Sequence, residues 1–156
     1  MNPKLSPVPM KVRRLHPIWS EFPFEPATDG SAGIDLRAAL DEPSVSIAPG
    51  GRRAIATGLA IEITEPGLAG FVFSRSGLGA KHGLVVAQGV GVIDPDYRGE
   101  ITVWLLNTSE THRAVTRGER IAQLVVMPFR PVRVEVVDAL GETRRGSGGF
   151  GHTGAL

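Results

Sequence analysis

The 156-residue chain contains no cysteine. This absence excludes disulfide bonds, thiolate metal sites and a cysteine nucleophile, and it is compatible with the reducing cytoplasm, where we expect the protein to reside. The chain also has no large excess of positive or negative charge, because its formal net charge is +1. Bulk electrostatic attraction to nucleic acid or to a membrane surface is therefore not expected, and we predict neither as a partner.

Long apolar runs and helical periodicity are almost absent. No run approaches the roughly 20 apolar residues that a membrane-spanning helix needs. Prolines interrupt residues 1–9, so the start of the chain does not resemble a signal peptide. At 156 residues, the chain is large enough to bury one core, and we expect one domain.

Glycine and proline, by contrast, are abundant, with 20 and 12 residues scattered between short apolar runs. Many tight turns imply many short strands. The pattern predicts an all-β, jelly-roll-like sandwich or barrel with at most one short helix, at 77–82. We expect a loose segment at 1–11, a β domain at 12–143 and a flexible glycine-rich arm at 144–156. The strands expected in the β domain are residues 45–47, 53–57, 59–63, 70–73, 84–86, 101–106, 121–126 and 132–137.

Residues 91–100 concentrate turn residues and reactive side chains between two apolar runs. The plain interpretation is a β-hairpin whose polar tip faces water. Asp94, however, ends an apolar run, which predicts a carboxylate at the edge of a pocket, and Tyr97 lies beside it. An acid next to an aromatic ring suits a small polar ligand with a flat or ring-shaped part.

Two further clusters carry charge next to turns. Arg75, Ser76 and Gly77 combine a guanidinium, a hydroxyl and a residue that permits close approach, which is typical of phosphate binding, although a surface turn explains them equally well. Asp35 interrupts an apolar strand pattern, which is unusual unless the acid is paired or lies near a cation. A structural Asp–Arg pair is the alternative interpretation.

The glycine-rich end of the chain contains Gly146-x-Gly148-x-x-Gly151, a literal match to the dinucleotide-binding pattern. The match carries no weight, because the chain ends five residues later, before the helix and the acid that the pattern requires. No P-loop sequence is present either. Successive free amides and an arginine are still able to wrap a polyphosphate, whereas composition alone favours a disordered tail.

Five segments in this order closely resemble the five motifs of the trimeric dUTP diphosphatase (dUTPase) family, over most of the chain. They are Ala-Gly-Ile-Asp-Leu-Arg-Ala at 32–38, Arg-Ser-Gly-Leu-Gly at 75–79, Gly-Val-Ile-Asp-Pro-Asp-Tyr-Arg-Gly at 91–99, Arg-Ile-Ala-Gln-Leu at 120–124 and Arg-Gly-Ser-Gly-Gly-Phe-Gly at 145–151. The resemblance implies a homotrimer with shared active sites. It also implies that water attacks the α-phosphorus of dUTP, with Mg²⁺ on the triphosphate, and yields dUMP and pyrophosphate. Such a reaction lowers dUTP and supplies dUMP for thymidylate synthesis.

The resemblance also implies roles for individual residues near the reacting groups. Asp94 matches the acid that activates the attacking water, as a general base. Tyr97 matches the ring that packs on the deoxyribose and excludes a 2′-hydroxyl. The segment of Arg75, Ser76 and Gly77 matches the group that binds the phosphates.

Motif by motif, the resemblance assigns the remaining site residues as well. Asp35 matches an acid that reaches Mg²⁺ through water. Gln123 matches a residue near the water and the α-phosphate, and Arg120 an inter-subunit contact. Arg145 matches a γ-phosphate ligand, and Phe150 the ring that stacks over uracil.

Uracil recognition is assigned to the edge of residues 87–91, through backbone groups. Either Gln88 or Gly89 contacts the base there, and Val92 and Ile93 are also implied to bind substrate.

Two alternative functions remain. A dCTP deaminase shares the fold but has Arg-Ser-Ser where this chain has Arg-Ser-Gly at 75–77. It also needs a catalytic glutamate, and no glutamate of this sequence is assigned to that role. A non-catalytic β-sandwich that binds nucleotide needs no water-activating acid.

Overall fold

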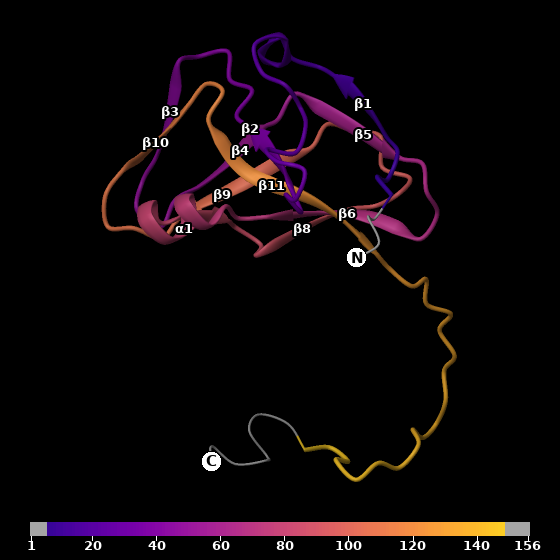
Figure 1. Ribbon diagram of the computed structural model, residues 1–156. Coiled ribbons are helices and arrows are strands. Elements are labelled where there is room, and N and C mark those ends of the chain that lie inside the picture. Colours follow the sequence, from indigo (N-terminus) through magenta and orange to yellow (C-terminus); the bar gives the residue numbers. More distant parts are fainter. Residues whose placement is uncertain (1–5, 149–156) are drawn as a thin grey trace.

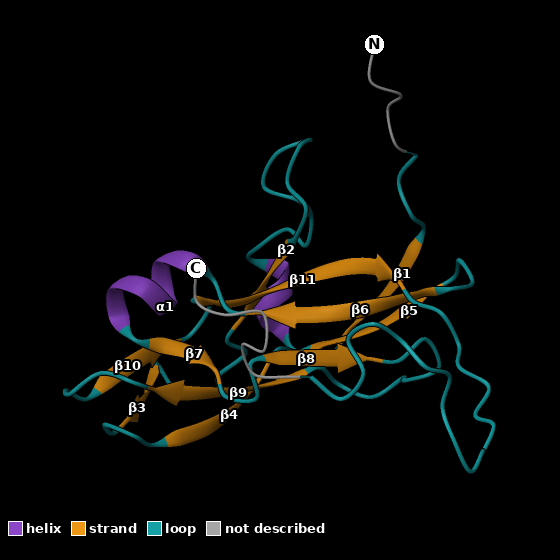
Figure 2. Cartoon of the chain, turned by 90° about the horizontal axis from the view of Figure 1, so that it is seen from below, coloured by secondary structure: helices purple, strands orange, loops and turns teal. Residues whose placement is uncertain are grey.

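Short strands dominate the computed structural model, which describes residues 6–148 of the chain. Figures 1 and 2 show that they gather into one body. The described chain beyond the last strand, residues 129–148, extends from it as an arm, which therefore begins before the expected residue 144. The predictions of an all-β fold and of one short helix are confirmed. The elements are β1 Met10–Arg14, η1 Pro17–Ser20, β2 Ile34–Arg37, β3 Ser44–Ile47, β4 Arg52–Ala56, β5 Leu59–Ile63, β6 Leu68–Phe73, α1 Ser76–His82, β7 Leu84–Val86, β8 Val90–Ile93, β9 Thr102–Asn107, β10 Arg113–Thr116 and β11 Arg120–Pro128.

Two sheets form the main layers. One has the order β2-β11-β6-β8 and the other the order β4-β9-β7, and the pairs β1-β5 and β10-β3 complete the sandwich. All the strand pairs are antiparallel. Strand β11, the longest of the described strands, pairs on both sides and lies with β6 in the interior of the four-stranded sheet.

The core lies between the two sheets and follows the two-residue alternation of the strands. On β9, Val103 and Leu105 are buried while Trp104 is half exposed. On β11, Leu124 is buried and packs in the same cluster as Leu36 of β2. Alternation of this kind buries one face of each sheet, which is the main source of stability in a sandwich.

Residues 91–100 do not form a simple hairpin tip, so that interpretation is wrong. Strand β7 pairs with β9, as the flanking apolar runs indicate, but β8 pairs with β6 of the other sheet. The chain therefore crosses from one layer to the other at residues 87–89. Periodicity identifies strands but not their partners, and here the partner is set by packing between the layers.

The two ends of the β domain also differ from the expectation. Strand β1 begins at Met10 and pairs with β5, so the last residues of the expected loose segment 1–11 are ordered. Sequence analysis also missed β10 and the turn of 3₁₀ helix η1. No strand forms at 132–137, where Val132, Val134 and Val136 are 84%, 80% and 94% exposed. Among the described residues, none of the helices is both long and apolar enough to cross a membrane.

Asn107 is the buried polar residue on which one end of the sandwich depends. Its Nδ2 donates to the carbonyl oxygens of Ile47 and Thr111, at 2.9 and 2.8 Å, and its Oδ1 accepts from the amide and the hydroxyl of Ser109. We expect Asn107→Ala to lower the free energy of unfolding by roughly 2–3 kcal/mol, because it leaves several buried groups unpaired. A fall in Tm of about 4–12 °C follows.

Thermal and urea unfolding check this expectation. The matched control is Thr102→Ala, an exposed residue on the same strand, which should change stability by less than about 0.5 kcal/mol. Equal Tm values for Asn107→Ala and the wild type would show that the Asn107 contacts contribute nothing net.

Candidate functional site

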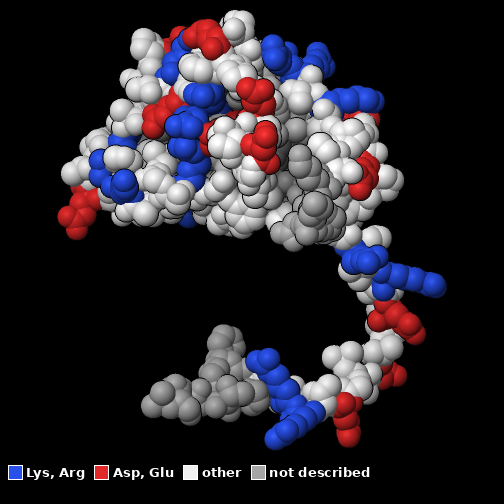
Figure 3. Space-filling model, viewed as in Figure 1, with Lys and Arg blue, Asp and Glu red and all other residues white. Residues whose placement is uncertain are grey.

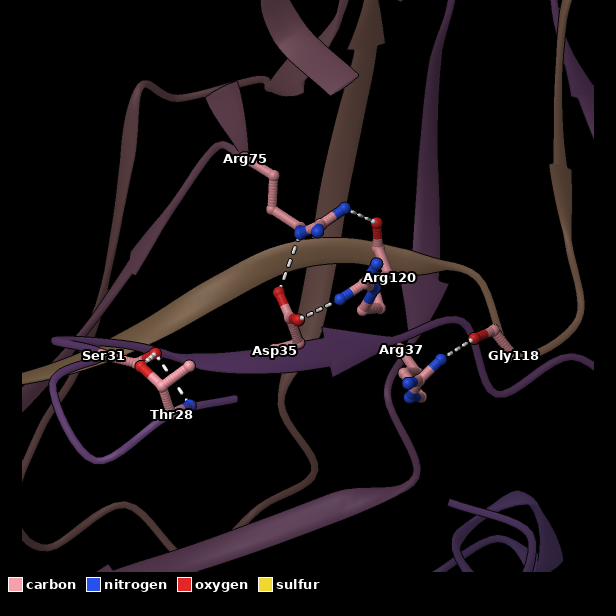
Figure 4. A network of polar contacts seen from close by, with 7 residues as sticks. All are labelled: Thr28, Ser31, Asp35, Arg37, Arg75, Gly118 and Arg120. Carbon is pink, nitrogen blue, oxygen red and sulfur yellow. Dashed lines mark hydrogen bonds and ion pairs between the residues drawn. The ribbon is translucent and has the colours of Figure 1, made fainter. Parts of the chain in front are cut away.

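Asp35 is the centre of a network of charged contacts with Arg75 and Arg120 (Figure 4). It lies on β2 directly opposite Gln123 of β11, so both side chains leave the same face of the sheet. Its Oδ1 accepts a hydrogen bond from Arg75 Nε at 2.7 Å, and its Oδ2 accepts one from Arg120 Nη1 at 3.1 Å. The predicted structural Asp–Arg pair is thus present, with two arginines instead of one.

Arg75 owes its position to the end of β6 and the beginning of α1. It occupies the N-cap position of the helix without a side-chain capping hydrogen bond, and Ser76 and Gly77 form the exposed first turn. The guanidinium is held twice, because Nη1 also donates to the carbonyl oxygen of Arg120 at 3.2 Å. These contacts fix the guanidinium before any ligand arrives.

Ser74 also organises the site, although sequence analysis missed it. Its carbonyl oxygen accepts from Gln123 Nε2 at 3.0 Å, and its hydroxyl accepts from the amide of Val86 at 2.8 Å. It therefore joins the Arg75 turn to both sheets. Serine is common in turns, so only the fold reveals this role.

These residues surround an open hollow of about 360 Å³, hereafter the Asp35 hollow. Its walls are mainly polar and come from the loop before β2, from the start of α1 and from β11. They consist of Ala27, Ser31, Ala32, Gly33, Asp35, Arg75, Ser76, Gly77, Arg120 and Gln123.

The charge around the Asp35 hollow is predominantly positive. Burial lowers the pKa of Arg37, and the nearby guanidinium groups of Arg120 and Arg75 lower it further. Arg37 also packs over the ring of Phe22, 4.0 Å from its centroid. Figure 3 shows a band of Lys and Arg side chains, with acids beside it, on one face of the body. One carboxylate among three guanidinium groups leaves a field that favours an anionic ligand.

Direct binding of a metal by a carboxylate cage does not fit this site. Within residues 6–148, no group of three or more His, Asp or Glu side chains is placed to hold a metal ion. Both oxygens of Asp35 already accept from guanidinium groups. A single carboxylate of this kind fits a Mg²⁺ ion that keeps its waters and reaches the protein through them.

Asp94 and Tyr97 lie in the loop after β8, hereafter the Asp94 loop (residues 94–98), and neither lines the Asp35 hollow. The Tyr97 amide donates to the carbonyl oxygen of Asp94 at 3.1 Å, which closes a turn. Tyr97 Oη donates to the carbonyl oxygen of Glu100 at 2.9 Å, and the ring is 44% exposed. Within one chain, therefore, Asp94 and Tyr97 are separate from the residues of the Asp35 hollow.

The residues predicted to recognise a base lie at the crossing from β7 to β8. Gln88 and Gly89 are exposed there, and Gly89 has a φ of +82°, a left-handed conformation that favours glycine. On β8, Val92 is 59% exposed, whereas Ile93 packs against the core. The two side chains therefore point to opposite faces of the sheet, and only Val92 faces the same side as Asp35.

Two predicted arginines remain to be placed. Arg120 contacts Asp35 and Arg75 within the chain, so its predicted inter-subunit contact stays a prediction. Arg145 lies in the arm and does not line the Asp35 hollow, and its Nε donates to the carbonyl oxygen of Gly148 at 2.9 Å. Phe150 lies outside the described residues.

Known proteins resemble the chain over most of its length. The dUTPase family model matches residues 23–154. The deoxyuridine 5′-triphosphate nucleotidohydrolase of Pseudomonas aeruginosa (strain LESB58) is 52% identical over 87% of this chain and 90% of that protein. The enzyme of the same name from Xylella fastidiosa (strain M12) is 44% identical over 99% of both chains.

A solved structure of a Staphylococcus bacteriophage 80alpha dUTPase with dUpNHpp is similar in fold. The TM-score is 0.82 at 26% identity, and the match covers 94% of this chain and 98% of that one. The match supports the predicted jelly-roll sandwich. The nucleotidohydrolase relatives favour dUTP hydrolysis over dCTP deamination and over non-catalytic nucleotide binding.

Gly33 tests the geometry of the Asp35 hollow. A Cβ at this position would lie 3.1 Å from Gln123 Oε1 and 3.3 Å from the carbonyl oxygen of Leu124. We expect Gly33→Ala to displace the Gln123 carboxamide and to weaken the binding of pyrophosphate, a probe of suitable charge, by about fivefold or more. Isothermal titration calorimetry measures the affinity.

Gly30→Ala is the matched control, because a Cβ there meets nothing within 4 Å. Its pyrophosphate affinity should equal that of the wild type. A Gly33→Ala protein that binds as tightly as the control would show that the position of the carboxamide is not constrained by residue 33.

Proposed function

The chain belongs to the dUTPase family, and we propose that it hydrolyses dUTP to dUMP and pyrophosphate, with the Asp35 hollow as its phosphate site. The observation that carries this proposal is the pair of guanidinium groups, Arg75 and Arg120, held by one carboxylate next to the first turn of α1. A fixed guanidinium is suited to the planar recognition of phosphate oxygens.

In the proposed reaction, Arg75, Ser76 and Gly77 bind the triphosphate. Because Arg75 is already held by Asp35 and by the backbone of Arg120, little side-chain conformational entropy is lost when the substrate binds. Its charge stabilises the negative charge that develops on the leaving pyrophosphate. Gln123, whose Nε2 donates to the carbonyl oxygen of Ser74, is proposed to contact the α-phosphate or the attacking water.

Asp94 is proposed as the group that orients the attacking water and accepts its proton. The Tyr97 ring then packs against the deoxyribose and leaves no room for a 2′-hydroxyl. Neither residue lines the Asp35 hollow of its own chain, and we propose that a second copy supplies them. The proposed active site is therefore shared between chains.

A sheet face beside the Asp35 hollow supports this assembly. Asp35, Gln123, Phe73 and Val90 form one row across the four strands, and Val125, Phe71 and Val92 form the next row. The apolar members are half exposed or exposed in the single chain. This apolar sheet face consists of Phe71, Phe73, Val90, Val92, Val125 and Met127. Burial of such a face against a second copy would bring the Asp94 loop of that copy to the Asp35 hollow.

We propose a homotrimer as the closed assembly, in keeping with the resemblance of the motifs. The arm offers a second contact, because Val132, Val134 and Val136 alternate with other residues and are almost fully exposed. An alternating segment of this kind is suited to pair with the sheet edge of a neighbour.

Mg²⁺ and the end of the arm complete the proposed site. Asp35 would hold a Mg²⁺ ion through its waters, and the ion would supply neutralisation of the phosphate charge. Residues 144–156 close over the bound nucleotide, with Arg145 on the γ-phosphate and Phe150 on uracil. The edge 87–91 reads the base through backbone groups, with Gln88 or Gly89 in contact. The reaction would lower dUTP and supply dUMP for thymidylate synthesis in the cytoplasm.

A panel of nucleoside triphosphates with Mg²⁺ tests the function. We expect dUMP and pyrophosphate from dUTP, with UTP, dTTP and dCTP at least ~100-fold poorer in kcat/KM. Chromatography identifies the products. Ammonia from dCTP would indicate a deaminase instead, and equal turnover of UTP would contradict the proposed role of Tyr97.

Asp94→Asn tests the proposed general base, because it keeps the shape of the side chain but removes the charge. Its kcat should fall ~10²–10⁴-fold while a non-hydrolysable dUTP analogue still binds. A normal kcat for this variant would show that Asp94 is only a turn residue.

The shared site makes a separate prediction about mass. Light scattering should give about three times 16.6 kDa for the wild type. Val92→Asp places a charge on the apolar sheet face, so it should yield monomers and lose dUTP hydrolysis. Val8→Asp, at an exposed position before β1, should leave both mass and activity unchanged. A fully active monomer would contradict the shared site.

A further inference from the structure

Arg98 directly follows Tyr97 and has no role in the reaction described so far. Its Nη1 donates to two carbonyl oxygens of the Asp94 loop, that of Pro95 at 2.7 Å and that of Tyr97 at 3.0 Å. Its Nη2 lies 3.6 Å from Oε1 of Glu62 on β5. One guanidinium thus joins the loop to a strand of the body.

The Asp94 loop has few other restraints. Asp94 and Asp96 are exposed, and the loop contains no strand or helix. One backbone hydrogen bond closes its turn, from the Tyr97 amide to Asp94, and the Tyr97 hydroxyl makes one further contact beyond the loop. The positions of Asp94 and Tyr97 therefore depend on a short segment, and Arg98 binds two carbonyl oxygens of that segment.

We propose that Arg98 is a positioning residue of the hydrolysis reaction, which holds Asp94 and Tyr97 in their working geometry through the carbonyl groups of Pro95 and Tyr97. This inference rests on the proposed function. Arg98 touches neither the base, the sugar nor the phosphates in this scheme. It acts on the loop backbone, and displacement of a reacting group by about 1 Å is enough to reduce a rate 100-fold.

The chemistry of the side chain suits this role. A guanidinium is planar, is always charged and offers several donors in a fixed arrangement, so it satisfies two carbonyl oxygens and a carboxylate together. A lysine ammonium at the end of a flexible chain lacks that arrangement. Arg98 is 52% exposed, in a hollow of about 260 Å³ that Lys11, Arg13 and Glu62 also line. Solvent therefore has direct access to the position of the guanidinium.

Arg98→Ala tests the inference against Lys11→Ala. Lys11 lines the same hollow and contacts the same Glu62, at 3.2 Å, but makes no contact with the Asp94 loop. We expect Arg98→Ala to lower kcat/KM for dUTP by about 10- to 100-fold and to reduce the preference for dUTP over UTP. The control should retain both values, and the Tm of the two variants should be similar because both side chains are exposed.

Chemical rescue separates positioning from a general structural effect. Millimolar guanidinium chloride should restore part of the activity of Arg98→Ala and none of that of Asp94→Asn, whereas sodium chloride at equal ionic strength should restore neither. If Arg98→Ala fails to fold, Arg98→Lys replaces it, with an intermediate loss of selectivity expected.

Three results would overturn the inference. They are wild-type kcat/KM and selectivity in Arg98→Ala, equal losses in Lys11→Ala, and a loss without rescue that is accompanied by a lower Tm. The wild-type assay keeps the two proposals apart, because an inactive wild type removes the proposed function itself, whereas an active wild type with an equally active Arg98→Ala removes only the role of Arg98.

Discussion

The contact of one carboxylate with two guanidinium groups is the constraint on which the site depends. Asp35 comes from β2, Arg75 from the start of α1 and Arg120 from the start of β11. Three segments that are distant in sequence are therefore tied at one point. Without the carboxylate, Arg75, Arg120 and the nearby Arg37 would repel one another more strongly. Burial lowers the pKa of Arg37, and the charges of Arg120 and Arg75 lower it further, whereas Asp35 raises it. The same balance leaves positive charge in excess, as a phosphate ligand requires.

Much of the fold was readable from the sequence, because short apolar runs between turn residues identify strands such as β5 and β11 without tertiary information. Strand β1 was not readable, since three of its five residues are charged and its order comes from pairing with β5. Residues 132–137 show the opposite case. Their alternation is typical of a strand, yet a strand needs a partner, and the single chain offers none to this segment.

The site was predictable where side-chain chemistry itself carries the signal. Asp35 and Arg75 stand out because charge is unusual beside an apolar strand, and the structure brings them together. Ser74 and Gly33 gave no such signal. A serine that acts through its carbonyl oxygen and a glycine that matters by lacking a Cβ resemble any other turn residue until the packing around them is known. The separation of Asp94 from the Asp35 hollow was equally invisible, because sequence order does not reveal distance.

The crossing at residues 87–89 has a thermodynamic consequence. Its amides are bound on both sides, with Ala87 donating to Trp104 in one sheet and Gly89 to Val86 at the turn, before β8 enters the other sheet. The conformational entropy of this segment is therefore lost when the chain folds and not when a ligand arrives. A ligand read by such an edge meets a preorganised template, whose affinity is not reduced by the cost of ordering a loop. Discrimination at this edge would then depend on shape, and would change little with temperature-driven loop motion.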